Sequence, residues 1–338
     1  MKSIRISRGQ RGAAGLAAAA AFALALTACS SSGEQTSLGG GDDGGSGSGD
    51  LTELNISMVP VIDALPVMYA QDNGYYEEAG LDVNFSDTDS GPAVVTAVVN
   101  GTYDAAYTAW FPAMIAMSKG AQIKFISPVS VSDPEGGTSG IVVKPDSPIK
   151  SYADLEGKTV ATNALTSLTT LSTKIQMKEH GADPESINFT ALPFKASVQA
   201  VAQGQADAAV VVSPFQTEAK MNGMRIVADP IKESMPGGSP GLVLFTSNQN
   251  AEDKADALQA FNEATVRAAK ELQGKEDLRR QMAHDVIGLP EDVAQKVPMP
   301  GIATEPIDLQ KLQNQADLAY DFGYLKKPLT ADDLVVDF

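Results

Sequence analysis

The sequence predicts an α/β protein of two lobes, each a mostly parallel sheet flanked by helices, with a helical C-terminal tail. Three observations predict this fold. Short apolar runs alternate with amphipathic segments from residue 54 onward, this order of segments occurs twice, and the pattern after residue 250 is mainly helical. Strands that alternate with helical segments indicate crossover connections and therefore parallel sheets.

The chain begins with a positively charged stretch followed by an apolar one. Four cations precede the first acid at Glu34, and residues 13–28 are mostly alanine and leucine. This apolar stretch is shorter than the roughly 20 residues that span a bilayer, so residues 1–28 are predicted to be a signal peptide.

The apolar stretch ends in Leu26-Thr27-Ala28-Cys29, which resembles the end of a bacterial lipoprotein signal. In that class of protein, the cysteine carries the lipid, with acyl chains such as palmitate. Cys29 is the only cysteine of the chain, so it is the predicted lipidation site. The alternative is an ordinary secretory signal with an incidental cysteine.

Residues 29–50 are predicted to be the lipidated cysteine and a flexible tether. Glycine and serine occupy 14 of the 21 positions from 30 to 50. Such a segment cannot bury an apolar core, and it has a root-mean-square reach of about 25 Å. The folded body therefore begins near residue 51.

The first set of alternating segments spans residues 54–108. The strand-like runs are residues 54–59, 81–85 and 104–108, and the helical patterns are residues 64–79 and 92–100.

The second set spans residues 158–212. Its strand-like runs are residues 158–162, 187–192 and 207–212, and its helical patterns are residues 169–180 and 196–203. Residues 98–106, VVNGTYDAA, align with residues 201–209, VAQGQADAA, at an offset of 103. A duplication and convergent βαβ chemistry both remain open as explanations, and both predict two similar lobes.

Four β-rich runs connect the two sets, at residues 122–131, 139–144, 225–229 and 241–246. They predict two extended crossings between the lobes, which would form a hinge. The tail has helical patterns at residues 277–287, 290–296 and 308–322, and it is expected to pack on the first lobe. Lobe one is therefore predicted as residues 51–128 plus 245–338, and lobe two as residues 129–244 with the hinge crossings.

Composition excludes several classes of function. The formal net charge is −17, and removal of the four cations in residues 1–28 brings it near −21. Such an acidic protein is not expected to bind nucleic acid, whose phosphates require lysine and arginine. One cysteine and two histidines leave no disulfide framework and no four-ligand zinc site. We expect no cofactor and no metal.

Several segments together resemble one family of binding proteins. They are residues 66–76 (PVMYAQDNGYY), 80–83 (GLDV), the two G-x-x-D-A segments beginning at Gly101 and Gly204, and residues 154–158 (DLEGK). These segments are similar to those of the solute-binding proteins of ABC importers that take sulfonate, taurine, nitrate or the thiamin pyrimidine precursor. The resemblance spans about half of the chain.

This resemblance implies a periplasmic binding protein of type II. It implies a monomer that captures a small organic solute, either a sulfonate, an aromatic or heterocyclic acid, or a pyrimidine-like compound. Hinge closure would bury the solute, and an ABC permease with its ATPase would be the partners. With lipid on Cys29, the protein would lie on the extracytoplasmic face of the cell membrane.

Ligands of open parallel sheets bind beyond the carboxyl ends of the strands, next to helix N-termini. Five turns of the chain are expected there, and their candidate ligand-binding residues are Ile62, Asp63, Ser90, Gly91, Thr108, Trp110, Asn163, Thr166, Ser167, Ser213 and Phe215. The serines and threonines have helix capping as an alternative role. Asp63 is either a turn residue or a carboxylate that reads an amine or hydroxyl group.

Trp110 and Phe215 are expected to form aromatic walls of the cleft, with core packing as the alternative. The family often has Glu-Pro where this chain has Ser213-Pro214, so one charged contact is expected to be missing. No arginine lies between Arg11 and Arg225, and this gap disfavours a guanidinium clamp. Lys195 is either a cation beside the cleft or a solvated surface residue.

Two other functions remain open at this point. One is a receptor that serves a sensor or another class of transporter on the same fold. The other is an extracytoplasmic enzyme on this scaffold, although neither His180 nor His284 has a candidate nucleophile nearby in sequence. The sequence favours a binding protein that is not an enzyme.

The first prediction concerns Cys29. Because only this residue offers a thiol, Cys29→Ser is expected to leave the precursor without lipid and to move the protein out of the membrane fraction. Metabolic labelling with a fatty acid and intact mass measure this directly. Unchanged lipid labelling of the variant would contradict the prediction.

Overall fold

Two five-stranded sheets with the same strand pattern organise the chain. The computed structural model describes residues 51–337 except residues 60, 89, 134–136 and 236. The predictions on residues 1–50 (signal peptide, lipidated cysteine and tether) lie outside the described residues.

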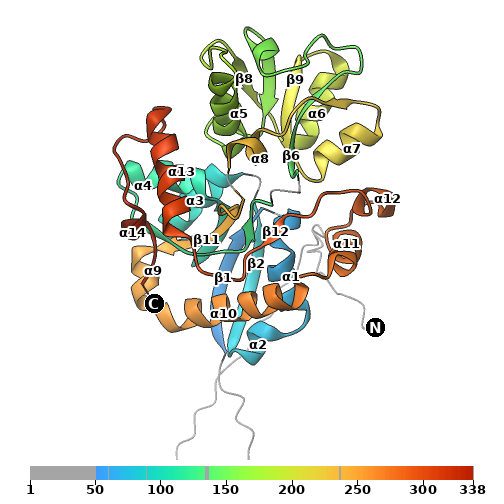
Figure 1. The fold of residues 1–338 in the computed structure, drawn as a ribbon. Helices are drawn as coiled ribbons and strands as arrows, with labels where there is room; N and C mark the ends of the chain where they lie inside the picture. Colours follow the sequence, from blue (N-terminus) through green and yellow to red (C-terminus); the bar gives the residue numbers. More distant parts are fainter. Residues whose placement is uncertain (1–50, 60, 89, 134–136, 236, 338) are drawn as a thin grey trace, which may run out of the picture. The chain divides into compact units, whose positions relative to one another are not determined.

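The first sheet has the strand order β2-β1-β3-β11-β4. Its strands are β1 (Thr52–Met58), β2 (Leu81–Asp87), β3 (Ala105–Ala109), β4 (Ile123–Pro128) and β11 (Leu242–Ser247). β1 pairs in parallel with β2 and β3, whereas β11 runs antiparallel to β3 and β4. Four strands therefore share one direction, and β11 is the strand that returns from the second sheet (Figure 1).

The second sheet repeats this pattern in the order β10-β6-β9-β7-β8. Its strands are β6 (Ser139–Val143), β7 (Thr159–Thr162), β8 (Asn188–Ala191), β9 (Ala208–Val212) and β10 (Arg225–Ile226). β7 pairs in parallel with β8 and β9, and β6 runs antiparallel to β9 and β10. The predicted α/β class with mostly parallel sheets is confirmed, and the repeat seen in the sequence is a repeat of topology.

Helices connect the parallel strands in both sheets. In the first set they are α1 (Leu65–Asp72), α2 (Tyr75–Glu78), α3 (Gly91–Val99) and α4 (Trp110–Ser118), and in the second set α5 (Leu168–Glu179), α6 (Phe194–Gln203) and α7 (Phe215–Met221). One helix was predicted for residues 64–79, but the structure divides it. Gly74 has a φ of 73°, a left-handed conformation that interrupts the helix at low steric cost.

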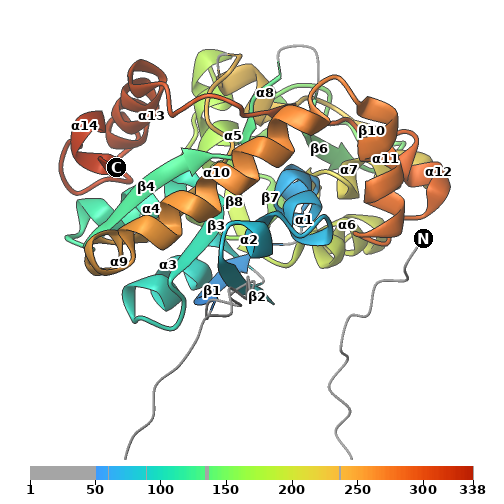
Figure 2. The same ribbon diagram turned by 90° about the horizontal axis from the view of Figure 1, so that it is seen from below.

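The predicted helical tail is present. It comprises α9 (Asn248–Asp253), α10 (Ala255–Leu272), α11 (Glu276–Asp285), α12 (Glu291–Ala294), α13 (Leu309–Asp321) and α14 (Ala331–Leu334). The long helix α10 crosses in front of β1 and β2 in Figure 1, and Figure 2 shows it from below, running from α9 towards α11. Phe261 of α10 stacks on Tyr76 with 4.6 Å between ring centroids, within a core cluster that also contains Leu54 and Ile56 of β1.

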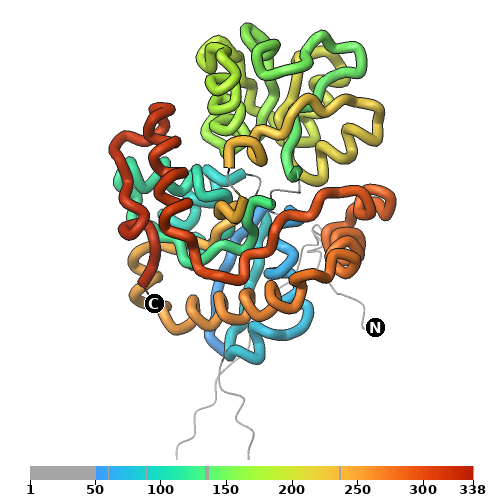
Figure 3. The backbone as a smooth tube through the Cα atoms, viewed as in Figure 1, coloured from blue at the N-terminus to red at the C-terminus, as the bar shows by residue number. Residues whose placement is uncertain are grey.

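The tail and α4 enclose a second apolar core. Leu312 and Ala316 of α13 share it with Phe111 and Met114 of α4, and the red C-terminal segment lies beside the cyan α4 in Figure 3. Leu171 of α5, a helix of the second sheet, belongs to the same cluster. The described residues form part of one compact unit, Ser48–Phe338, and the boundaries of the two lobes stay a prediction.

The chain passes between the sheets twice. The first passage leaves β4 through β5 (Ser130–Val131), which pairs with β12 (Gly301–Ile302) of the tail. The second passage contains α8 (Pro230–Ser234) and leads into β11. None of the helices among the described residues is long and apolar enough to cross a bilayer.

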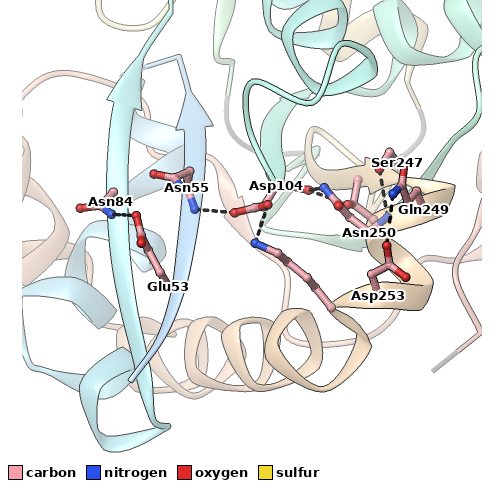
Figure 4. Close-up of polar contacts among 10 residues, drawn as sticks. Glu53, Asn55, Asn84, Asp104, Ser247, Gln249, Asn250 and Asp253 are labelled. Carbon is pink, nitrogen blue, oxygen red and sulfur yellow. Dashed lines mark hydrogen bonds and ion pairs between the residues drawn. The ribbon is translucent and has the colours of Figure 1, made fainter. Parts of the chain in front are cut away.

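Asp104, the aspartate of the first G-x-x-D-A segment, connects three strands of the first sheet and the start of the tail (Figure 4). Its Oδ2 accepts the backbone N–H of Asn55 at 2.9 Å, and its Oδ1 lies 2.7 Å from the Lys254 ammonium. Its carbonyl oxygen accepts Thr246 Oγ1 at 2.6 Å and Asn250 Nδ2 at 3.0 Å. One residue therefore joins β3 to β1, β11 and the start of the tail.

Asp207 of the second segment has the matching role in the second sheet. Its Oδ2 accepts the backbone N–H of Thr159 at 2.8 Å, and its own N–H donates to the Thr159 carbonyl at 2.9 Å. Asp104 donates its N–H to the Asn55 carbonyl in the same way, at 2.8 Å. The repeated aspartate is thus a residue that fixes the amino end of one strand to its parallel neighbour.

The second prediction compares these two aspartates. Asp104→Ala is expected to lower the free energy of unfolding by about 2–3 kcal/mol, because it removes a charge-assisted hydrogen bond and a half-buried ion pair. Asp207→Ala is expected to cost only about 1 kcal/mol, since Asp207 is exposed and has no lysine partner within the described ion pairs. Urea denaturation measures both, and a larger effect at Asp207 would contradict the assignment.

Candidate functional site

A cavity of about 160 Å³ lies where the carboxyl ends of strands from both sheets meet the crossing segments. Its polar lining residues are Asp63, Thr108, Ser132, Asp133, Thr138, Asn163, Ser167, Thr169 and Lys232. Its apolar lining residues are Val59, Val61, Pro92, Ala109, Pro112, Val131, Leu168, Phe194, Val212, Ile231, Met235, Pro240, Leu242 and Pro300, and Gly91 and Gly241 complete the wall. A small, mostly apolar chamber with a few polar groups suits a small solute.

A larger hollow of about 1130 Å³ lies against α10 and the C-terminal segment. It is open to solvent, and charged groups of both signs line it, among them Glu263, Arg267 and Lys270. We therefore place the candidate site in the smaller cavity.

Four helices direct their N-terminal ends to the cavity. Gly91 of α3, Leu168 of α5 and Phe194 of α6 are first residues of their helices and line it, and Ala109 immediately precedes α4. Each of these helices has nine or more residues. Their free N–H groups and the positive ends of their dipoles favour a negatively charged or acceptor group of a ligand.

A connected set of side chains surrounds the start of α5. Ser167 caps the helix by accepting the backbone N–H of Thr170 at 3.4 Å, and its Oγ lies 2.7 Å from Thr169 Oγ1. Thr169 Oγ1 donates to Asn163 Oδ1 at 3.0 Å. Three polar residues that line the cavity are therefore held in one orientation before any ligand binds, which lowers the entropic cost of binding.

Gly91 allows α3 to approach β3 closely. A Cβ atom at this position would lie 2.6 Å from Thr108 Oγ1 and 2.9 Å from Pro112 Cγ. Both of these residues line the cavity. Any larger side chain at position 91 would therefore displace the wall that α3 and α4 form together.

The charged groups of the cavity come from different elements. Asp63 lies in a short 3₁₀ helix (Ile62–Ala64) after β1, Asp133 lies in the first crossing segment, and Lys232 lies in α8. Asp63 Oδ1 accepts Ser130 Oγ at 2.6 Å. Burial raises the pKa of Asp63, while Ser130 and the charge of Arg279 act in the opposite direction.

Five of the residues predicted from sequence line the cavity together: Asp63, Gly91, Thr108, Asn163 and Ser167. The others lie elsewhere. Ile62 is 1% exposed in an apolar cluster with α11, Ser90 caps α3 without a side-chain bond, and Thr166 is outside the lining. Ser213 is buried and accepts Gln216 Nε2 at 2.7 Å.

The expected aromatic wall is corrected by the structure. Trp110 is 0% exposed and packs edge-on against Phe111 at 5.5 Å, inside the core beneath α4. Phe215 lies behind Phe194, at 5.6 Å between ring centroids, and only Phe194 lines the cavity. A tryptophan that is the first residue of a helix can turn its ring toward the sheet, and here the apolar core takes it.

The cation that lines the cavity is not Lys195, the lysine considered from the sequence. Lys195 is exposed and outside the lining, whereas Lys232 lines the cavity. Arg279 of the tail approaches from behind, where its Nη2 donates to the carbonyl of Pro300, a lining residue.

Sequence reasoning missed Thr169, Phe194 and Lys232. Two of them had a signal, because Phe194 follows the predicted strand 187–192 and Thr169 begins a predicted helix. Lys232 had none, since α8 is a five-residue helix within a crossing segment. In the described part of the chain, no group of three or more acidic, histidine or cysteine side chains is placed to hold a metal ion.

The fold and this cavity define a solute-binding architecture, and the chain belongs to the NMT1/THI5-like family, whose model matches residues 62–276. An Escherichia coli protein named taurine-binding periplasmic protein is 25% identical over 217 residues, which are 64% of this chain and 65% of that protein. A Brachyspira hyodysenteriae protein named as an ABC transporter periplasmic binding protein is 24% identical over 252 residues, 70% of each chain.

Solved structures show the same fold. The alkanesulfonate-binding protein of Xanthomonas axonopodis pv. citri, bound to MOPS, superposes with a TM-score of 0.71 at 20% identity and covers 85% of this chain and 99% of that one. The family resemblance read from the sequence motifs and the periplasmic binding protein fold are therefore confirmed.

The third prediction separates Trp110 from Phe194. Trp110→Ala is expected to lower the free energy of unfolding by about 3–5 kcal/mol, because it empties a packed core site. Phe194→Ala is expected to change stability less and to weaken the most strongly bound small solute about tenfold. Urea denaturation and calorimetry on both variants measure this, and the reverse pattern would restore Trp110 to the cavity wall.

Proposed function

We propose that this protein is the extracytoplasmic substrate-binding component of an ABC importer and that it captures a small solute of the sulfonate or taurine kind. The observation that carries the proposal is the cavity at the carboxyl ends of strands from both sheets, where four helix N-termini meet. Membership of the NMT1/THI5-like family and the names of the relatives support this class of solute.

The chemistry of the cavity suits a sulfonate group at the start of α5. A sulfonate offers three acceptor oxygens and one negative charge. The N–H groups at the N-terminus of α5 supply donors, and Thr169 holds the side chain of Asn163, whose amide nitrogen is a further donor. The apolar wall, which includes Val59 and Phe194, would cover the carbon chain of the solute.

Capture would proceed by closure of two lobes. The chain passes twice between the sheets, and residues of both passages, among them Val131 and Met235, line the cavity. Rotation about these passages would bury the solute and present one closed surface to the permease. The lobe boundaries proposed for this motion are residues 51–128 plus 245–338 and residues 129–244.

The partners follow from the same proposal. The family members named above include a component of an ABC transporter, so a permease and an ATPase would receive the solute from this protein. Lipid on Cys29 would anchor the protein at the membrane, and the segment 30–50 would let the folded body reach the permease. The body would act as a monomer and as a carrier, without catalysis.

The fourth prediction tests binding and closure. Taurine or ethanesulfonate at 100 times its dissociation constant is expected to add about 2.7 kcal/mol to the free energy of unfolding by mass action. Solution scattering is expected to show a smaller radius of gyration with the bound sulfonate than without it. A panel of small sulfonates without any effect on melting would refute the solute class, while binding with unchanged scattering would refute closure alone.

A further inference from the structure

Asp63 is the polar residue of the cavity whose charge the protein does not neutralise by direct contact. It lines the cavity, and its side chain is half-buried. The protein donors that reach it are Ser130 Oγ, at 2.6 Å from Oδ1, and its own backbone N–H. Asp63 forms none of the ion pairs found in the described part of the chain.

Arg279 does not take this role. Its Nη2 donates to the Pro300 carbonyl, and its Nε has no partner although the side chain is 9% exposed. It influences Asp63 and Asp133 through space rather than by contact. Arg279 therefore offsets part of the negative charge of Asp63 from a distance. It forms no ion pair with Asp63.

The surroundings make an unpaired carboxylate at this place costly. Val59, Val61 and Val131 line the same cavity. Burial is the largest influence on the Asp63 pKa and raises it, which means that the surroundings disfavour the ionised form. An ionised group in such a place normally has a charged partner with hydrogen-bond donors.

We propose that this partner is the ligand, and that Asp63 binds a protonated amine on the captured solute. The proposal rests on the function proposed above and names the solute class more closely: a short zwitterion with its ammonium group at Asp63 and its anionic group at the N-terminus of α5. A hydroxyl group would leave the carboxylate charge uncompensated, so an ammonium group fits better.

The size and charge of the cavity agree with a short zwitterion. A volume of about 160 Å³ equals that of roughly five water molecules in the liquid. The two carboxylates that line it, Asp63 and Asp133, belong to the 3₁₀ helix after β1 and to the first crossing segment, whereas Thr169 lies in the first turn of α5. The donors for an anion and the acceptors for a cation thus come from different elements.

The experiment measures binding of matched pairs of solutes to the full mature protein by calorimetry at pH 7 and constant salt. The pairs are taurine with ethanesulfonate and β-alanine with propionate, so each pair differs by the amine. The wild type is expected to bind the amine member of at least one pair at least tenfold more tightly. Asp63→Asn, which keeps an acceptor for Ser130, is expected to abolish this preference.

Asp104→Asn is the matched control. Asp104 also accepts hydrogen bonds within the first sheet, but it lies at the amino end of β3 and outside the cavity. This variant is expected to lower the melting temperature and to keep the preference for the amine. A lost preference in both variants would show that destabilisation, and not the carboxylate of Asp63, caused the effect, and would overturn the proposal.

The outcomes separate this inference from the proposed function. Equal binding of taurine and ethanesulfonate by the wild type overturns the role of Asp63 and leaves the sulfonate-binding function standing. If neither sulfonate nor β-alanine binds, both the amine proposal and the proposed solute class are overturned. The wild-type pairs decide whether an amine is preferred even where Asp63→Asn fails to fold, because that preference is measured without a substitution, and the variant assigns it to Asp63.

Discussion

The rest of the structure depends on how each sheet fixes the amino end of its third strand to the first strand. Asp104 and Asp207 each close a two-way bridge to the neighbouring strand, through the N–H and carbonyl of Asn55 and of Thr159. A slip by one residue would move every side chain of a strand to the other face of the sheet, and these bonds add to the apolar pattern in fixing the register. Because the register is fixed at this end, the opposite ends of the strands, where the cavity lies, are placed as well.

The site follows from that placement. Strands β2, β3, β7 and β8 end at the cavity, so the helices that follow them, α3, α4, α5 and α6, begin there and their N-terminal N–H groups face one space. The backbone donors of the cavity therefore follow from the topology. Beside them, the side chains of Ser167, Thr169 and Asn163 form a hydrogen-bonded polar set. Asp63 is the exception, since it adds a charge opposite to that of the helix dipoles.

The sequence was sufficient for the class of fold and the repeat, because both depend on periodicity and on short motifs such as G-x-x-D-A. It also located the turns at which five of the lining residues lie. It was insufficient for Trp110 and Lys232. The indole at the first position of α4 can turn either toward the core or toward the cavity, and only the packing against Phe111 decides this. Lys232 lies at the cavity because of the way the second crossing segment folds around the short helix α8. No periodicity in the sequence predicts that local fold.

Helix α5 connects the binding site to the tail, and this limits how the proposed closure can occur. Its first turn lines the cavity, while Leu171 and Ile175 share a core cluster with α13. Farther along, Lys174 Nζ lies 5.9 Å from the Tyr324 ring and Lys178 Nζ lies 5.0 Å from the Phe322 ring. Each such cation–π contact contributes about 0.5–1 kcal/mol at an exposed site. Opening by a large rotation of the second sheet would break these contacts and expose the apolar cluster. In the proposed closure, these contacts favour the arrangement described here over a widely open one, so the motion would be limited to rotations that keep α5 on the tail.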